Sequence, residues 1–371
     1  MIEYIFINNY KSFVNFRTDF NQLNLLMGKN GAGKSNLLLI VKDLCAFIRG
    51  GLGVNTATIF PYSAKTRWMN SNIQTFEVRI SDKEHTYLYR LEIEQDKERN
   101  LGMVSLEKVM CDDKLIYHTD KGVTRVYDDN GLNERIAYTD MTMSGVNVVP
   151  ADEAHNLLHS FKNAVNRIVY CSIDPKRMYD YIENDISGPN YDFSNIASTF
   201  VALQMLYPDS YQDIKAAMQE IDPTFQGAHT MLAQSGKYLA ADYLFDGVKV
   251  TLRFDELSDG EKMLFALYLI LYGLEKNGFV VLLDEPDNYI SLREIQPWCV
   301  EMENLIQGEN QMIIVSHHPE MIDYLATSYG IWFDRLKSGE SVVVDDPYYK
   351  KEEAKFMTYS ELIARRVIDE A

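Results

Sequence analysis

The sequence has no long apolar segment, few cysteines and a deficit of basic residues. Its longest apolar run, Met263 to Leu274, has about half the length that a bilayer-spanning helix needs, so we expect no membrane anchor. The four cysteines are scattered without a C-x-x-C pair, which disfavours a zinc ribbon and suits a reducing cytosol. The net charge of −18 disfavours a protein that binds nucleic acid mainly by neutralising phosphates.

We expect no secretory signal, because the first residues show no basic segment followed by an apolar one. We therefore expect a cytoplasmic protein. With 371 residues, of which 46% are hydrophobic, the chain is long enough to bury a core as one large domain or two small ones.

A phosphate-binding loop is the clearest motif in the chain. Residues Gly28 to Ser35 read Gly-Lys-Asn-Gly-Ala-Gly-Lys-Ser, which is the complete pattern G-x-x-x-x-G-K-[ST]. An apolar strand precedes the loop and a helix follows it, so backbone N–H groups at the helix start favour an anion. Lys34 supplies a positive charge, and Ser35 supplies a hydroxyl for Mg²⁺. The predicted nucleotide-binding residues of this loop are Gly28, Asn30, Gly31, Gly33, Lys34, Ser35 and Asn36.

Two carboxylates follow a second apolar strand. The run Phe279 to Leu283 is followed by Asp284 and Glu285. In a P-loop enzyme Mg²⁺ needs an acidic partner at the carboxyl end of a strand, where the nucleotide lies, and Asp284 fits that place. Glu285 is then placed to orient or deprotonate an attacking water. The sequence therefore predicts a site that binds ATP and Mg²⁺ and hydrolyses the nucleotide.

Two further segments flank this strand. Ser258 opens a helix with Glu261 three residues later, which predicts a capping box. Ser258 and Gly260 at a helix start also form a candidate anion site that faces outward, toward the γ-phosphate held by another molecule. Downstream, the apolar run Met312 to Val315 ends in Ser316 and His317, and His317 is a candidate γ-phosphate contact.

The order of elements predicts an α/β fold in three parts. Residues 1–150 contain the phosphate-binding loop and an antiparallel β subdomain, with a hairpin over Phe76 to Gln95. Residues 151–240 form an inserted helical lobe, with helical spacing over 152–166 and 195–220. Residues 241–371 alternate strands and helices, with a helix over 260–276, which implies a mostly parallel sheet.

These motifs, in this order, resemble the ABC-type ATPase heads of the SMC/RecF/OLD group. The resemblance implies a P-loop ATPase head with a mostly parallel sheet core, an antiparallel β subdomain and a helical lobe. It implies that Lys34 and Ser35 bind the phosphates and Mg²⁺, and that Asp284 binds Mg²⁺. The roles that it implies for other residues are catalytic base for Glu285, switch histidine for His317, D-loop for residues 286–288, and Q-loop metal contact for Gln74.

The same resemblance implies that Ser258 and Gly260 act in trans, on the nucleotide held by a partner subunit. The chain is also similar to bacterial ATPases labelled AAA-21 or AAA-15, through its first residues, the segment Asp284 to Ile290, the segment Ser316 to Glu320 and the tail 359–365. Many of these ATPases work in anti-phage systems beside a separately encoded nuclease or toxin. We therefore expect a homodimer or higher homo-oligomer, a separate effector protein and no membrane partner.

Other interpretations remain open. A RecF-like ATPase for DNA repair or chromosome maintenance would bind DNA directly, which the acidic composition disfavours without excluding. A scaffold that binds ATP without hydrolysis is disfavoured by the Asp284–Glu285 pair, and a transporter subunit by the Leu-Ser-Asp-Gly-Glu signature. His155 and His159 could share a helix face, but without a third ligand we interpret them as solvent-facing.

Overall fold

The computed structural model describes residues 1–54, 59–131, 134–149, 155–183, 187–306, 310–344 and 357–364. The chain divides into two compact units, and each contains segments that are far apart in the sequence. Unit 1 comprises Met1–Asn21, Gly28–Ile168 and Ile331–Pro347, and unit 2 comprises Gln22–Met27, Val169–Gly330 and Tyr348–Ala371. No helix in the described part of the chain is both long enough and apolar enough to cross a bilayer.

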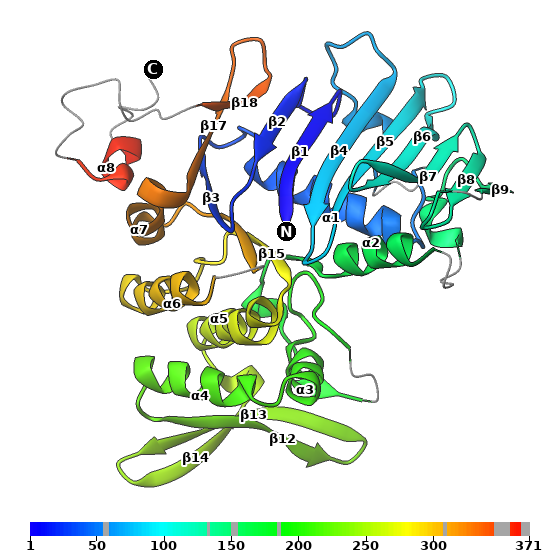
Figure 1. Ribbon diagram of the computed structural model, residues 1–371. Coiled ribbons are helices and arrows are strands. Elements are labelled where there is room, and N and C mark those ends of the chain that lie inside the picture. The colour runs from blue at the N-terminus through cyan, green and yellow to red at the C-terminus, as the bar shows by residue number, and fades with distance from the viewer. Residues whose placement is uncertain are drawn as a thin grey trace. The chain divides into compact units, whose positions relative to one another are not determined.

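Unit 1 is built on an eight-stranded antiparallel sheet (Figure 1), in the order β2-β1-β4-β5-β6-β7-β8-β9. The strands are β1 (Ile2–Asn8), β2 (Phe16–Asp19), β4 (Ile73–Ser81), β5 (Thr86–Asp96), β6 (Leu101–Cys111), β7 (Lys114–Asp120), β8 (Val123–Tyr127) and β9 (Glu134–Tyr138). A second hairpin of this unit joins β17 (Gly330–Arg335) to β18 (Ser341–Val344). The predicted antiparallel subdomain is therefore confirmed.

The β4–β5 hairpin shows how local sequence specifies this sheet. Apolar residues alternate with polar ones along both strands, and in β5 the buried positions follow this period of two. The turn is closed by Asp82, whose carboxylate accepts hydrogen bonds from the N–H groups of Glu84 and His85 at 2.9 and 2.8 Å. An aspartate that binds the backbone two residues ahead stabilises a turn, and the predicted hairpin is confirmed with slightly wider bounds.

Two helices of unit 1 pack on one face of this sheet (Figure 1): α1 (Lys34–Arg49) and α2 (Asn156–Asn166). The ring of Phe161 on α2 stacks on Tyr89 of β5 with centroids 5.8 Å apart. Arg49 ends α1 and donates to the carbonyl oxygens of Val165 and Ile168. These bonds satisfy carbonyls at and beyond the end of α2. Residues 152–154 of the helix predicted over 152–166 lie outside the described part of the chain.

Unit 2 contains a parallel sheet in which β10 (Ile168–Cys171), β15 (Val280–Asp284), β16 (Gln311–Val315) and β3 (Leu23–Gly28) follow one another. The pairs β15–β16 and β16–β3 are parallel. Strands buried on both faces read as continuous apolar runs, which is the pattern of Val280 to Leu283 and of Met312 to Val315. The predicted parallel core is confirmed.

A second sheet of unit 2 is antiparallel and has four strands, β11 (Tyr181–Ile182), β12 (Phe225–Ala233), β13 (Gly236–Phe245) and β14 (Val248–Arg253). Helix α4 (Ser210–Ile221) packs on β12, and α3 (Ile196–Leu206) lies on the same side (Figure 1). The segment predicted as a helical lobe thus contains strands as well as helices. The sequence predicts a strand over Tyr243 to Phe254, which corresponds to the end of β13 and to β14. It hides β12, because this strand exposes many of its residues and shows no strong apolar alternation.

The remaining helices of unit 2 are α5 (Asp259–Tyr268), α6 (Leu292–Leu305), α7 (Pro319–Tyr329) and α8 (Tyr359–Ala364). The helix predicted over 260–276 changes type after Tyr268, where a π-helical segment spans Leu269–Leu274 and a 3₁₀ turn spans Glu275–Asn277. Gly273 lies in this segment, and a Cβ atom there would lie 2.7 Å from Leu203 of α3. Close packing thus accompanies the change of helix type, which periodicity does not reveal.

Candidate active site

The phosphate-binding loop joins the end of β3 to the start of α1. Gly28 has φ 131°, and a Cβ atom there would lie 1.9 Å from the carbonyl oxygen of Phe333, so no side chain fits. Gly33 has φ 111°, precedes α1, and accepts the first helical hydrogen bond, from the N–H of Leu37 at 2.9 Å. Both positions need glycine for conformation and for space. Asn30 and Gly31, between them, are exposed.

Lys34 lies inside this loop. Its side chain is buried, and Nζ donates to the carbonyl oxygens of Gly28 and Lys29 at 2.7 and 2.9 Å. The start of α1 has no side-chain cap and no acidic residue in its first turn. Uncapped N–H groups with a lysine beside them fit an anionic phosphate, and the half-buried hydroxyl of Ser35 follows directly. The residues present therefore fit the phosphates of a nucleotide.

Two polar residues that the sequence did not single out support the loop. The hydroxyl of Ser12 lies 2.6 Å from the hydroxyl of Ser341 on β18, and the N–H of Ser341 donates to the Ser12 carbonyl at 2.9 Å. A Cβ atom on Gly33 would lie 2.8 Å from the Ser341 oxygen, so this pair packs against the start of α1. Asn36, predicted to bind nucleotide, uses its side-chain oxygen to accept from Lys11 Nζ at 2.7 Å.

Gln74, predicted as a metal contact, lies in the interior of the antiparallel sheet on β4. It is fully buried, and its side-chain oxygen accepts a hydrogen bond from Gln95 Nε2 at 2.7 Å. Gln95 also donates to the carbonyl oxygen of Phe60. The oxygen that a metal ion would take is thus engaged in a hydrogen bond inside the sheet, and the role of Gln74 as a metal contact stays a prediction.

The acidic residues stand at the carboxyl edge of the parallel sheet in unit 2. The strand registers place Val315 beside Asp284 on one side and beside Leu26 on the other. The ends of three parallel strands therefore share one edge, and Gly28, where the phosphate-binding loop begins, is the last residue of β3. This is the edge at which open α/β sheets bind ligands.

Asp284 is oriented by a tyrosine that the sequence did not reveal. The hydroxyl of Tyr170 on β10 donates to Asp284 Oδ2 at 3.1 Å. Burial and the Asp284 carboxylate raise the pKa of Tyr170 well above its ordinary value, so this hydroxyl remains a donor at neutral pH. The Asp284 carboxylate is half-buried, and carboxylate oxygens are ligands that suit Mg²⁺.

Glu285 has a strained backbone. Its φ is 51°, in the left-handed region that side chains other than glycine and asparagine rarely adopt, and its N–H donates to the Val315 carbonyl at 2.9 Å. The carboxylate accepts from Asn288 Nδ2 at 3.3 Å. The hydrogen bonding between β15 and β16 thus continues one residue beyond β15, to Glu285. Such strain is typical of functional sites.

The end of β16 carries the candidate switch histidine. His317 is exposed, whereas Ser316 is buried. Ser316 Oγ accepts from the N–H of His318 at 3.0 Å and also bonds the nearby Asp287 carboxylate. Asp287 is buried, and burial raises its pKa despite Ser316 and His318. Residues after β15 and β16 are therefore connected through buried polar contacts.

The capping box at the start of α5 is confirmed. Ser258 Oγ accepts from the N–H of Glu261 at 3.3 Å, and Glu261 Oε2 accepts from the N–H of Ser258 at 2.8 Å. Ser258 is exposed, and Tyr243 holds the other Glu261 oxygen at 3.1 Å. A Cβ atom on Gly260 would lie 3.2 Å from the carbonyl oxygen of Tyr289, so the helix start packs closely on the segment after β15.

Comparison with known proteins agrees with this architecture. Residues 145–323 match the family profile described as "AAA domain, putative AbiEii toxin, Type IV TA system". The curated proteins gave no match. Among solved structures, the chain is similar to an Smc head bound to the C-winged helix domain of ScpA, with 16% identity, a TM-score of 0.55, and coverage of 92% of this chain and 97% of that one.

A second similar structure is the Pyrococcus furiosus Smc head domain with an extended coiled coil, bound to the C-terminal domain of ScpA. It has 13% identity and a TM-score of 0.51, and the match covers 100% of this chain and 98% of that chain. At these identities the likeness concerns the fold. The chain therefore has the fold of the Smc head domains.

Proposed function

We propose that this protein is an ATP-hydrolysing switch that dimerises around two nucleotides and controls a separately encoded effector in defence against phage. The observation that carries the proposal is the carboxyl edge of the parallel sheet, where Asp284, the strained Glu285 and the end of β16 come together. The left-handed backbone of Glu285, at the edge where the strands end, supports a functional role for its carboxylate.

In this proposal the chain binds the nucleotide mainly through its phosphates. The loop N–H groups and Lys34 hold the phosphates, while Ser35 and Asp284 are the residues that would hold Mg²⁺. When bound, Mg²⁺ neutralises charge on the phosphate oxygens. Glu285 orients the attacking water and accepts its proton, and His317 contacts the γ-phosphate. Catalysis of this kind consists of positioning and charge stabilisation.

The second half of each site comes from another copy of the chain. Ser258 and Gly260 stand at an exposed helix start, where N–H groups and the helix dipole favour an anion. In the closed dimer they contact the γ-phosphate that the partner subunit holds. Binding of two nucleotides closes the dimer and hydrolysis reopens it, so ATP turnover becomes a conformational signal.

The proposed effector is a separate protein. The description of the matched family profile names a toxin and a TA system, and the two similar Smc heads are bound to ScpA. Proteins with this fold therefore occur together with partner proteins. The resemblance to the ATPases of two-gene anti-phage systems supports a nuclease or toxin as the partner. The expected setting is the cytoplasm, where phage DNA and its products are present.

The substitution Glu285→Gln tests the enzymatic part. We expect ATP binding to persist, because the phosphate-binding loop is unchanged, and kcat to fall by about 10²–10⁴-fold, as for the loss of a general base. Light scattering with ATP should then show a particle of twice the mass of one chain. Lys34→Ala is the matched variant, which should bind no nucleotide and stay open. Wild-type hydrolysis by Glu285→Gln would contradict the assignment of the base.

Phage plating on cells that carry this gene with its neighbouring gene tests the defence role. We expect protection with the wild-type chain and its loss with Lys34→Ala. If phage plate equally well on both strains and on cells without the genes, the proposed defence role is wrong. The ATPase assignment is tested separately, by Glu285→Gln.

A further inference from the structure

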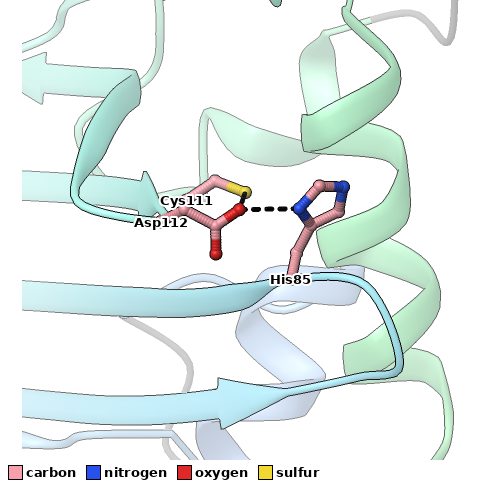
Figure 2. Close-up of side chains that lie close together, drawn as sticks. All are labelled: His85, Cys111 and Asp112. Carbon is pink, nitrogen blue, oxygen red and sulfur yellow. Dashed lines mark hydrogen bonds and ion pairs between the residues drawn. The ribbon is translucent and has the colours of Figure 1, made fainter.

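Two neighbouring turns of the antiparallel sheet in unit 1 bring together three side chains of types that can bind a metal ion. None of them belongs to the phosphate-binding loop. His85 closes the turn between β4 and β5, Cys111 is the last residue of β6, and Asp112 begins the turn to β7. Because β5 and β6 are antiparallel neighbours, Cys111 lies opposite Tyr87, and the N–H of Asp112 donates to the Thr86 carbonyl at 2.9 Å. Figure 2 shows the three side chains directed toward one another.

The three donor atoms lie close enough together for one metal ion to reach them after side-chain adjustment. His85 Nδ1 lies 2.7 Å from Asp112 Oδ2, Cys111 Sγ lies 3.8 Å from the same oxygen, and all three ligand atoms lie within 4.8 Å of one another. Zinc bonds of about 2.0–2.3 Å require donor separations of roughly 3.3–3.6 Å. To ligate one metal ion, His85 Nδ1 and Asp112 Oδ2 would have to move apart by roughly 0.6 Å, and rotation of the imidazole would adjust the separation between Nδ1 and Cys111 Sγ.

The backbone already fixes two of the three ligands. Asp112 Oδ1 accepts from the N–H of Thr86 at 2.9 Å, which leaves Oδ2 on the side of the imidazole and the thiol. The N–H of His85 donates to the Asp82 carboxylate at 2.8 Å, so the turn that carries the imidazole is also held. Outer hydrogen bonds of this kind orient metal ligands and contribute to affinity.

The types of donor atom favour a particular cation. A divalent cation would bind the Cys111 sulfur as a thiolate, and the thiol proton would leave to solvent. The donor set of one nitrogen, one sulfur and one oxygen suits zinc and does not suit Mg²⁺ or Ca²⁺, which take oxygen ligands.

We propose that His85, Cys111 and Asp112 form a zinc site, with water as the fourth ligand. The metal joins the β4–β5 turn to the β6–β7 turn and stabilises this end of the antiparallel sheet. The inference does not depend on the proposed ATPase cycle, because none of the three residues belongs to the candidate active site.

Cobalt titration of the untagged, chelator-treated full chain in excess Mg²⁺ tests the proposal, since Co²⁺ replaces Zn²⁺ at such sites. We expect one equivalent of Co²⁺ to give a thiolate-to-cobalt charge-transfer band in the near ultraviolet, and Zn²⁺ to abolish it. Cys111→Ser should lose the band, and His85→Gln should weaken Co²⁺ binding at least about tenfold. Zn²⁺ should raise the thermal midpoint of the wild type and leave that of Cys111→Ser unchanged.

Cys299→Ser is the matched control, because Cys299 is also a buried free cysteine but lies on α6 of unit 2. It should keep the band and the stabilisation by Zn²⁺. The proposal is wrong if the wild type gives no band, if the band persists in Cys111→Ser, or if it disappears in Cys299→Ser. If Cys111→Ser does not fold, the same titration of His85→Gln, at a half-buried position, tests the proposal.

Discussion

Single residues at the candidate site are constrained by neighbours that come from distant parts of the chain. Glu285 keeps a left-handed backbone because its N–H is bound to Val315, and Asp284 is held by the Tyr170 hydroxyl, 114 residues away. Backbone strain of this kind costs of order 1–3 kcal/mol and persists only where the surrounding structure enforces it. A positioning role for Tyr170 follows from this arrangement.

Tyr170→Phe tests that role. Removal of the hydroxyl leaves the ring packed but releases one oxygen of Asp284, so we expect the Mg²⁺ concentration for half-maximal ATPase activity to rise roughly tenfold, with a smaller change in kcat at saturating Mg²⁺. Tyr272→Phe is the matched control, because it removes a hydroxyl that donates to Glu301 at 2.9 Å outside the site. Equal Mg²⁺ dependence in the wild type and Tyr170→Phe would refute the positioning role.

Asp43 on α1 gives a prediction about pH. Burial raises the pKa of Asp43 to about 6 from 3.8, although Lys42 and Lys11 act in the opposite direction. Because the folded-state pKa is the higher one, ionisation opposes folding, and stability is lost as the pH rises from about 4 to about 6. Asp43→Asn avoids this loss, so it should stabilise the protein by up to about 3 kcal/mol above pH 6.

Thermal unfolding of wild type and Asp43→Asn across this range provides the measurement. The difference between their midpoints should be largest above pH 6 and close to zero near pH 4. Glu98→Gln, at an exposed turn, is the control and should show no such trend. A difference for Asp43→Asn that stays constant with pH would show that ionisation of this carboxyl is not its cause.

Helices differ in how their starts are capped. Helices α5 and α6 begin with capping boxes, whereas α1 begins at Gly33 with no side-chain cap. A capped helix start is stable without a ligand, while an uncapped one has N–H groups that a phosphate can satisfy. Because α2, α3, α4 and α7 also lack a side-chain cap, it is the glycine-rich loop and Lys34, together with the uncapped start, that fit α1 for a phosphate. In α5 the cap residue Ser258 is exposed, so the same residue can stabilise its helix and contact a partner's nucleotide.

A mixing experiment separates these two roles of Ser258. A Ser258→Arg chain and a Lys34→Ala chain should each lack ATPase activity alone, because each spoils both composite sites of its own dimer. Mixed in equal amounts they should form heterodimers with one intact site, so activity should reach roughly a quarter of the wild-type value if the subunits pair at random. No recovery at any ratio, with both variants folded by circular dichroism, would count against sites shared between subunits.

The molecule as a whole carries a net charge of −18, so two copies would repel each other in the proposed closed dimer. Salt screens such repulsion, with a Debye length of about 10 Å at 0.1 M. Binding of duplex DNA responds in the opposite way, because salt weakens contacts with phosphates. The response to salt therefore distinguishes the proposed switch from a RecF-like ATPase that binds DNA directly.

For Glu285→Gln at saturating ATP, we expect the dimer dissociation constant to fall several-fold between 50 and 200 mM KCl, a range over which DNA binding weakens strongly. Analytical ultracentrifugation gives the dissociation constant, and wild-type ATPase activity with and without duplex DNA is measured at the same salt concentrations. Stimulation by DNA at low salt that disappears at 200 mM KCl would favour the DNA-binding alternative.

The sequence alone determined the features that depend on short stretches of chain. The loop from Gly28 to Ser35, the capping box at Ser258 and the apolar strand before Asp284 are local patterns whose chemistry follows from residue type and spacing. The β4–β5 hairpin was predictable for the same reason. Features without a clear periodic signal were not predictable in this way, namely the exposed strand β12 and the π-helical segment after α5.

Only the tertiary structure decided which distant residues meet. The Tyr170–Asp284 bond, the Ser12–Ser341 pair beneath the phosphate-binding loop and the His85–Cys111–Asp112 cluster all depend on strand order and register. It also placed Gln74 inside the sheet, bound to Gln95. Register is set by packing and hydrogen bonds between strands far apart in the chain, and no short sequence window contains that information.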